Sequence, residues 1–250
     1  MSDHELAARL ATEAGALLLG IRTRLAGASA EERKESGDKG SHDFLLSALA
    51  TERPGDAVLS EEGPPEEADP IRLTADRVWI VDPLDGTREF SEPGRTDWAV
   101  HVALWQRNGI SGDLVAGAVA LPAEGVTLAT PKVAAPPAAT EVPRIVVSRT
   151  RPPAVALEVR EELNGVLVEM GSAGAKVASV IQGLSDVYVH AGGQYEWDSA
   201  APVAVARAAG LHTSRIDGTP LAYNQRDSKL PDLLVCRPEF ANAVLAVTAS

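Results

Sequence analysis

Two aspartates, Asp82 and Asp85, follow an apolar stretch and stand three positions apart on one turn. Residues 79–87 read Trp-Ile-Val-Asp-Pro-Leu-Asp-Gly-Thr, and the proline starts a turn that lets both carboxylates face one cation. Gly86 and Thr87 then open the next element, where free backbone N–H groups bind an anion well. Carboxylates beside an anion-binding turn predict a divalent metal between the acids and a phosphate.

Other acids have comparable positions. Glu61, followed by Glu62, ends an expected strand over 57–60, Asp198 begins an alanine-rich helix, and Asp38 precedes a helix. Hard oxygen ligands of this kind suit Mg²⁺, and two such ions can polarise a phosphoryl group, activate water and stabilise the leaving oxygen. Each acid alone is equally compatible with a turn or a helix cap. The whole string from Asp82 to Thr87 is much more specific.

Two other motifs with similar residues do not fit the spacing. A helix–loop–helix calcium site that began at Asp82 would need a glutamate where this chain has Pro93. Phosphatases with an aspartate nucleophile have one residue between their two aspartates, whereas two separate Asp82 from Asp85. The spacing therefore disfavours both a calcium site of this kind and catalysis by an aspartate nucleophile.

Composition limits the class of protein. The 250 residues carry a formal net charge of -12, which argues against nucleic acid or an anionic membrane as the main partner. One cysteine, Cys236, excludes an internal disulfide, and no apolar run is long enough to span a membrane. The N-terminus has no signal-peptide pattern. We therefore expect a soluble cytoplasmic protein.

Periodicity places the elements of the first half. A capping box at 2–5 begins a helix, residues 27–40 are expected to form a mobile flap, and a second helix follows and ends before Pro54. Strands are expected at 57–60 and 78–82, with a loop over 61–76 between them. Residues 97–105 alternate, with Trp98 and Trp105 on opposite faces. This half is predicted to be a largely antiparallel sheet with helices.

Residues 131–143 are rich in proline and alanine and mark the best boundary, so the predicted halves are 1–140 and 141–250. Beyond them strands and helices alternate, which favours an α/β half. The expected strands are 144–148, 166–169, 186–190 and 233–236, and the expected helices are 153–163, 173–182, 199–209 and 239 onward. None of the five histidines has metal-pair spacing with another, so a structural role is favoured for all of them.

The chain resembles the lithium-sensitive, Mg²⁺-dependent phosphatase superfamily of inositol monophosphatase and fructose-1,6-bisphosphatase. The motifs are Ser60-Glu61-Glu62, the string at 79–87, and Trp197-Asp198-Ser199-Ala200-Ala201. The resemblance covers nearly the whole chain and implies an α/β fold, a layered αβαβα sandwich with the site between its halves. It also leaves a homodimer open as an alternative to a monomer.

Within the superfamily the chain is most similar to the 3′(2′),5′-bisphosphate nucleotidases. Arg88-Glu89-Phe90 after Thr87, Glu196 before Trp197, and segments 147–149 and 171–176 carry this similarity. It implies hydrolysis of the 3′-phosphate of 3′-phosphoadenosine 5′-phosphate to AMP and phosphate, in sulfate assimilation. Inositol monophosphate or fructose 1,6-bisphosphate remain alternative substrates, and a non-catalytic nucleotide-binding protein is a more distant alternative.

The resemblance also implies roles for single residues. Glu61, Asp82 and the Leu84 carbonyl would hold one Mg²⁺, Asp82, Asp85 and Asp198 a second, and a third ion is an option near Glu61. Asp38, paired with Thr87, would orient a metal-activated water for in-line attack. Here the chain departs from the family, which has Val-Thr-x-x-Asp where this chain has Glu35-Ser36-Gly37-Asp38. The expected substrate-binding residues are Asp85, Gly86, Thr87, Arg88, Arg149, Ser172 and Lys176, although exposed surface positions are the alternative for the three cations.

Overall fold

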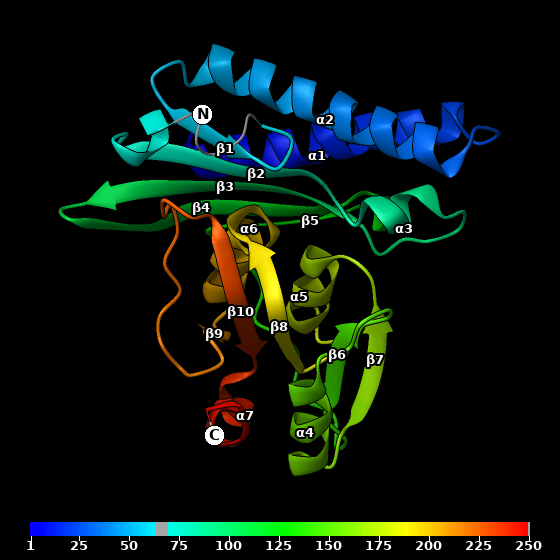
Figure 1. Cartoon of the computed structure of the whole chain (residues 1–250), viewed down its shortest axis with the longest axis vertical. Coiled ribbons are helices and arrows are strands. Elements are labelled where there is room, and N and C mark those ends of the chain that lie inside the picture. The colour runs from blue at the N-terminus through cyan, green and yellow to red at the C-terminus, as the bar shows by residue number, and fades with distance from the viewer. Residues whose placement is uncertain (64–69, 250) are drawn as a thin grey trace.

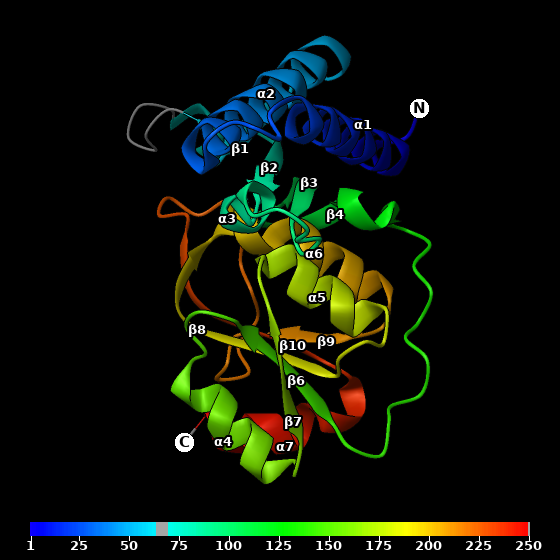
Figure 2. The same cartoon turned by 90° about the vertical axis from the view of Figure 1, so that its right-hand side faces the viewer.

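The structure, a computed structural model, describes residues 1–63 and 70–249. Its elements form five layers: two helices, a sheet, two helices, a second sheet and two outer helices (Figure 1). The same layers are separate when the molecule is viewed from the side (Figure 2). This arrangement confirms the expected layered αβαβα sandwich.

The first layer is built from α1 (Asp3–Arg24) and α2 (Ala30–Glu52). The predicted capping box begins α1, because the Glu5 N–H donates to Ser2 Oγ and the Ser2 N–H donates to Glu5 Oε2. Apolar residues recur along the inner face of α1, so this face packs on the first sheet. The buried set includes Leu6, Leu10, Leu18 and Ile21.

The expected flap over 27–40 is wrong, because α2 begins at Ala30 after the N-cap Ser29. The glycines in this stretch lie where the helix packs closely. A Cβ at Gly37 would lie 2.8 Å from Leu84 Cδ2 and 2.8 Å from Phe90 Cε1. Sequence reasoning took these glycines as a sign of flexibility, whereas Gly37 makes room for the residues that follow Asp82.

The first sheet has the order β1-β2-β3-β4-β5, with β1 parallel to β2 and the other neighbours antiparallel. The alternation over 97–105 is confirmed: Trp98 lies in the core under α1 and α2, and Trp105 lies in the core on the other face. Only 61–63 and 70–76 of the predicted loop are described, and they include a short 3-10 helix, Pro70–Leu73. The strands are β1 (Ala57–Ser60), β2 (Arg77–Asp85), β3 (Ala99–Asn108), β4 (Ser111–Leu121) and β5 (Val126–Ala129).

The second sheet has the order β7-β6-β8-β10-β9, with β6 parallel to β7 and β8, and β10 antiparallel to β8 and β9. Its inner face meets α5 (Ala173–Ile181) and α6 (Glu196–Ala208), and its outer face meets α4 (Ala154–Glu162) and α7 (Pro238–Thr248) (Figure 1). The strands are β6 (Arg144–Ser148), β7 (Val166–Met170), β8 (Val187–Tyr195), β9 (His212–Ser214) and β10 (Lys229–Cys236). Sequence reasoning missed β9, which is too short to show a period.

Three apolar cores fill the spaces between the layers. The outermost core holds Cys236, which is fully buried. The connection over 131–143 is held at Pro137, whose carbonyl accepts a hydrogen bond from Arg237 at 2.6 Å. The division into 1–140 and 141–250 stays a prediction. Across the described ranges, every helix is too short or too polar to cross a bilayer.

Candidate active site

Three aspartates from distant parts of the chain meet at one place. Asp82 and Asp85 lie at the end of β2, and Asp198 lies in the first turn of α6. One carboxylate oxygen of each lies within 4.8 Å of those of the other two. The layered fold explains this meeting, because α6 packs directly against the first sheet and places its N-terminus beside the end of β2.

The turn between Asp82 and Asp85 is fixed by buried hydrogen bonds. The Ser41 hydroxyl of α2 donates to the Pro83 carbonyl at 2.6 Å, and the Leu84 N–H donates to Asp82 Oδ1 at 3.0 Å. β2 is buried along nearly its whole length, so the aspartates have little freedom to move. The turn therefore presents its carboxylates in a defined geometry.

Negative charge accumulates at this place. Burial and then the Glu61 and Asp85 carboxylates raise the pKa of Asp82 well above its ordinary value. Burial and the Asp85 charge raise the pKa of Asp198 to about 6. Glu61 is exposed as a residue, but burial of its carboxyl group and the nearby acids Asp198, Asp85 and Glu62 raise its pKa to about 7. His101 and Lys176 offset only part of this negative charge, and the hard oxygen donors of the cluster fit Mg²⁺ or a similar cation.

The pKa of Asp85 shifts in the opposite direction from those of the neighbouring acids, and hydrogen bonds from the start of α5 contribute to this difference. Burial opposes its ionisation, but His101, Ser172 and Gly174 outweigh burial and lower the pKa of Asp85 to about 2. Asp85 Oδ2 accepts from Ser172 Oγ at 2.5 Å and from the Gly174 N–H at 2.6 Å, and Oδ1 accepts from the Ala173 N–H at 3.1 Å. The carboxylate is thus held as an anion at the N-terminus of α5.

His101 of β3 lies against the same acids, a proximity that sequence reasoning missed. Its Nδ1 is 3.0 Å from the Trp197 carbonyl, and its Nε2 is 3.2 Å from Asp85 Oδ2. Burial alone would lower the pKa of His101, but the Asp85 carboxylate raises it above its ordinary value. The alternation of β3 did place His101 on the face opposite Trp98, although nothing in the sequence shows that α6 covers that face.

Asp38 and Thr87 come together from α2 and α3 (Thr87–Ser91). Thr87 Oγ1 lies 3.4 Å from Asp38 Oδ1 and 3.2 Å from the Leu84 carbonyl. Burial and the Glu62 charge raise the pKa of Asp38 to about 7. Gly86, the N-cap of α3, has a φ of 84°, a left-handed conformation that favours glycine.

Lys176 is buried rather than exposed, and it lies in the first half of α5. Its Nζ donates to the Gly171 carbonyl at 3.1 Å and to the Ser172 carbonyl at 2.7 Å. Burial lowers the pKa of Lys176 from its ordinary value, although the charge of Asp85 partly opposes this change. Its positive charge therefore lies beneath the start of α5, close to Ser172.

The two arginines expected on the substrate side are paired with acids. Arg149 donates to Glu89 Oε1 at 2.7 Å and to Glu92 Oε1 at 2.8 Å, so it links two segments that are distant in the sequence. Arg88 is exposed, and it pairs with Glu92 at 3.2 Å. The structure brings the aspartates and Ser172 together, whereas it engages Arg149 and Arg88 in ion pairs.

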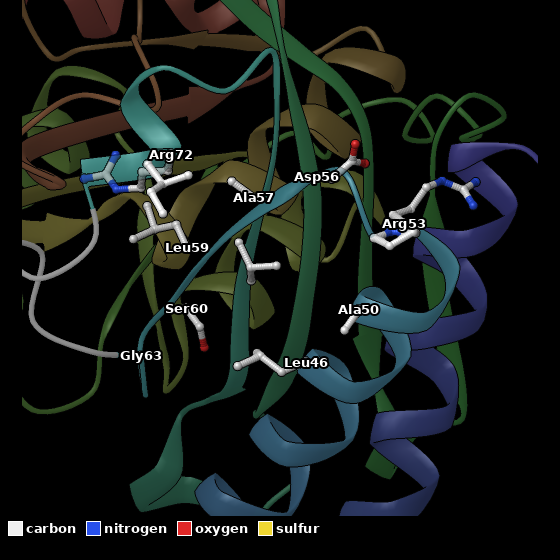
Figure 3. A pocket seen from close by; sticks show the side chains of 12 residues that line it. Leu46, Ala50, Arg53, Asp56, Ala57, Leu59, Ser60, Gly63 and Arg72 are labelled. Atoms are coloured by element: carbon white, nitrogen blue, oxygen red, sulfur yellow. The ribbon is translucent and has the colours of Figure 1, made fainter.

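A separate hollow of about 440 Å³ lies beside β1 (Figure 3). Its lining is mainly apolar and includes Leu46, Ala57 and Leu59, and none of the three clustered aspartates belongs to it. Gly63 and Ile71, which also line it, flank residues outside the described ranges. We therefore assign no function to this hollow.

The fold and the acidic site define a class of protein, and sequence comparison agrees with them. A model of the inositol monophosphatase family matches residues 3–247, and the chain belongs to this family. This result confirms the resemblance to the superfamily.

Among its relatives is a 3′-phosphoadenosine 5′-phosphate phosphatase of Mycobacterium bovis (strain ATCC BAA-935 / AF2122/97), 54% identical over 95% of this chain and 90% of the relative. A 3′(2′),5′-bisphosphate nucleotidase CysQ of Escherichia coli (strain K12) is 32% identical over 78% of this chain and 81% of the relative. The crystal structure of CysQ from Bacteroides thetaiotaomicron has a TM-score of 0.73 and 26% identity, and the match covers 93% of this chain and 96% of that one. The resemblance to the nucleotidase branch is confirmed as well.

Proposed function

We propose that this protein is a metal-dependent phosphatase that removes the 3′-phosphate of 3′-phosphoadenosine 5′-phosphate, giving AMP and phosphate. The proposal rests on one observation: Asp82, Asp85 and Asp198 come from distant parts of the chain and converge at one point. The high identity to relatives named as phosphatases of this substrate supports the choice of substrate.

Two Mg²⁺ ions, with a third as an option, are the proposed cofactors. Glu61, Asp82 and the Leu84 carbonyl would hold the first ion, and Asp82, Asp85 and Asp198 the second. The raised pKa values of Asp82, Asp198 and Glu61 fit this role, because burial and mutual repulsion raise them and a bound divalent cation offsets both. When bound, such ions polarise the phosphoryl group and lower the pKa of an attacking water.

The chain's own groups would orient the reactants. Thr87, whose hydroxyl lies between Asp38 and the Leu84 carbonyl, would direct a water toward phosphorus. The backbone N–H groups of Gly86 and Thr87 would donate to phosphate oxygens, a preorganised contribution that can be worth about 3 kcal/mol per donor. Attack would be in line, with no covalent bond between enzyme and substrate.

Recognition of the rest of the substrate is proposed for Ser172, Lys176, Arg149 and Arg88. The burial of Lys176 favours an electrostatic contribution through the start of α5 over an exposed point contact. Arg149 would need to leave Glu89 or Glu92, or share itself with them, to meet a phosphate.

The proposal is tested by phosphate release from four substrates: 3′-phosphoadenosine 5′-phosphate, its 5′-phosphosulfate relative, inositol 1-phosphate and fructose 1,6-bisphosphate. Assays contain Mg²⁺, with and without Li⁺, and the Asp198→Asn variant is the control for contaminating phosphatase. We expect the two adenosine compounds to have the highest kcat/KM, and Li⁺ to inhibit.

The inositol and fructose compounds are the alternative substrates, since the family model carries the name of inositol monophosphatase. A higher kcat/KM for inositol 1-phosphate would overturn the substrate assignment. Tight nucleotide binding without phosphate release from any of the four would identify a non-catalytic nucleotide-binding protein.

A further inference from the structure

His101 lies on β3 and is fully buried, and its ring fills the space between β3 and α6. The metal ligands and substrate-binding residues proposed above do not include it. Its ring nevertheless lies between acids that come from distant parts of the chain.

The imidazole spans the gap between two proposed metal ligands. On one side its Nδ1 meets the carbonyl of Trp197, the residue before Asp198, at 3.0 Å. On the other side its Nε2 lies 3.2 Å from Asp85 Oδ2. Both neighbours are oxygen acceptors, so each ring nitrogen faces an atom to which an N–H can donate.

The contact with Asp85 is close but poorly aligned. Among the described residues, Nε2 has no partner that meets the usual limits for a hydrogen bond. A buried ring nitrogen of this kind is costly unless the nearby carboxylate uses it. Because this contact is poorly aligned, it does not set the orientation of the ring alone, and the residues packed around the ring must also hold it against Asp85.

Gly174 of α5 provides the space for the ring. A Cβ at this position would lie 1.9 Å from His101 Nε2, and its next nearest neighbours would be two other atoms of the same ring. The Gly174 N–H donates to the same Asp85 oxygen at 2.6 Å. His101 and Gly174 thus hold Asp85 from two sides, and any side chain at 174 would displace the ring.

We propose that His101 is a positioning residue that fixes Asp85 relative to Asp198, and that Gly174 is the spatial partner it requires. The inference rests on the proposed function, because it treats both aspartates as ligands of Mg²⁺. A residue that orients a metal ligand typically contributes about 10- to 100-fold to metal affinity.

The test is a double-mutant cycle of His101→Ala, Gly174→Ala and the double variant. The main measurement is the Mg²⁺ concentration that gives half of the rise in thermal unfolding temperature, which needs no turnover. We expect each single variant to raise this concentration about tenfold. Gly174→Ala should add nothing in the His101→Ala background, since the ring it would strike is gone.

Two further variants separate positioning from packing. Val102→Ala, on the same strand but facing the core under α1 and α2, should lower the unfolding temperature and leave the Mg²⁺ midpoint unchanged. His101→Gln should restore part of the affinity, because its amide can donate to Asp85. If His101→Ala does not fold, the Mg²⁺ midpoints of Gly174→Ala and His101→Gln test the inference in its place.

Two outcomes would overturn the inference. An unchanged Mg²⁺ midpoint in a responsive, folded His101→Ala protein would contradict it and leave the proposed function standing. Additive effects of the two substitutions would contradict the pairing of His101 with Gly174. A wild-type protein whose stability ignores Mg²⁺ would contradict the proposed function and this inference together.

Discussion

Two carboxylates on one turn are treated in opposite ways by the fold. Burial and neighbouring acids oppose the charge of Asp82, whereas His101 and hydrogen bonds from the start of α5 support the charge of Asp85. Asp85 therefore remains an anion over the whole physiological pH range, while Asp82 needs a cation nearby to be ionised at low cost. The pair thus contains one carboxylate that is ionised before a metal binds and one whose ionisation a bound metal favours.

Replacing Asp85 by asparagine should keep the shape of the turn and remove its charge. We expect the Asp85→Asn variant to fold and to lose about 100-fold or more in kcat/KM, with a matching loss of Mg²⁺ affinity. Phosphate release against Mg²⁺ concentration measures both. Asp113→Asn, on an exposed strand residue that pairs with Arg207, is the matched control and should be neutral. Near-normal activity of Asp85→Asn at ordinary Mg²⁺ would remove Asp85 from the ligand set.

Lys176 is a second residue whose charge can be isolated. Lys176→Met keeps the aliphatic stem and removes the ammonium that bonds the Gly171 and Ser172 carbonyls. A bisphosphate carries more negative charge than a monophosphate, so KM for 3′-phosphoadenosine 5′-phosphate should rise by about fivefold or more, and KM for inositol 1-phosphate by less. Lys39→Met, at an exposed lysine, is the control. Equal increases for both substrates would exclude a role in discrimination.

At the scale of elements, the start of α5 forms a junction with the end of β2 and the residues before β3. It receives Asp85 through three hydrogen bonds, and the Gly171 N–H donates to Asp97 Oδ2 at 2.5 Å. Gly86 touches it from the other side, since a Cβ there would lie 3.0 Å from Ser172 Cβ. Substitutions at this junction should therefore affect the docking of α5 on the first sheet as well as the local backbone.

Gly86→Ala tests the junction against a matched glycine. Both Gly86 and Gly94 have positive φ, but a Cβ at Gly94 would meet nothing within 4 Å. We expect Gly94→Ala to cost about 1 kcal/mol of unfolding free energy and Gly86→Ala about 2 kcal/mol, because the second adds a steric contact. Chemical denaturation measures both. Equal costs would show that the contact with Ser172 yields easily.

Elements with a clear period could be predicted from the sequence, and contacts between elements could not. The string at 79–87 indicates the turn and its acids, and the alternation around Trp98 indicates a strand with Trp98 and Trp105 on opposite faces. The helix at 30–40 was missed because Gly37 and Gly40 serve packing with Leu84, Phe90 and Ile21, which lie elsewhere in the sequence. The position of His101 depends in the same way on α6.

At the scale of the whole molecule, the layers separate the stabilising cores from the charged site. The acids lie at the end of β2 and the beginning of α6, whereas the apolar cores lie between the layers, the largest of them on both sides of the α5 and α6 layer. Without bound cations the site therefore opposes folding through charge, while the cores support it. Stability should depend on whatever neutralises the acids.

Protons and Mg²⁺ should both neutralise them. Folded pKa values of about 7 for Glu61 and Asp38 exceed their unfolded values of about 4, so the folded state binds more protons between these limits. The unfolding temperature of the protein in EDTA should therefore rise as pH falls from about 8 to about 6.5. Below this range His190 and His212 act in the opposite sense, because burial lowers their pKa values.

Added Mg²⁺ should raise the unfolding temperature more at the upper pH than at the lower one, since it competes with protons for the same oxygens. Calorimetry with EDTA and with Mg²⁺ at the two pH values measures both effects. Glu61→Gln is the control, and it should reduce the pH dependence in EDTA to the part that Asp38 contributes. An unfolding temperature in EDTA that drops on acidification through this range would contradict the argument.

Cys236 has a practical consequence for handling this protein. The single thiol is sealed behind α4 and α7, and burial raises its pKa to about 12, so it is scarcely nucleophilic in the native state. Reducing agents, which can interfere with metal titrations, can be left out of the buffer. The rate of labelling by a thiol reagent then reports how often the outermost layer, α4 and α7, opens.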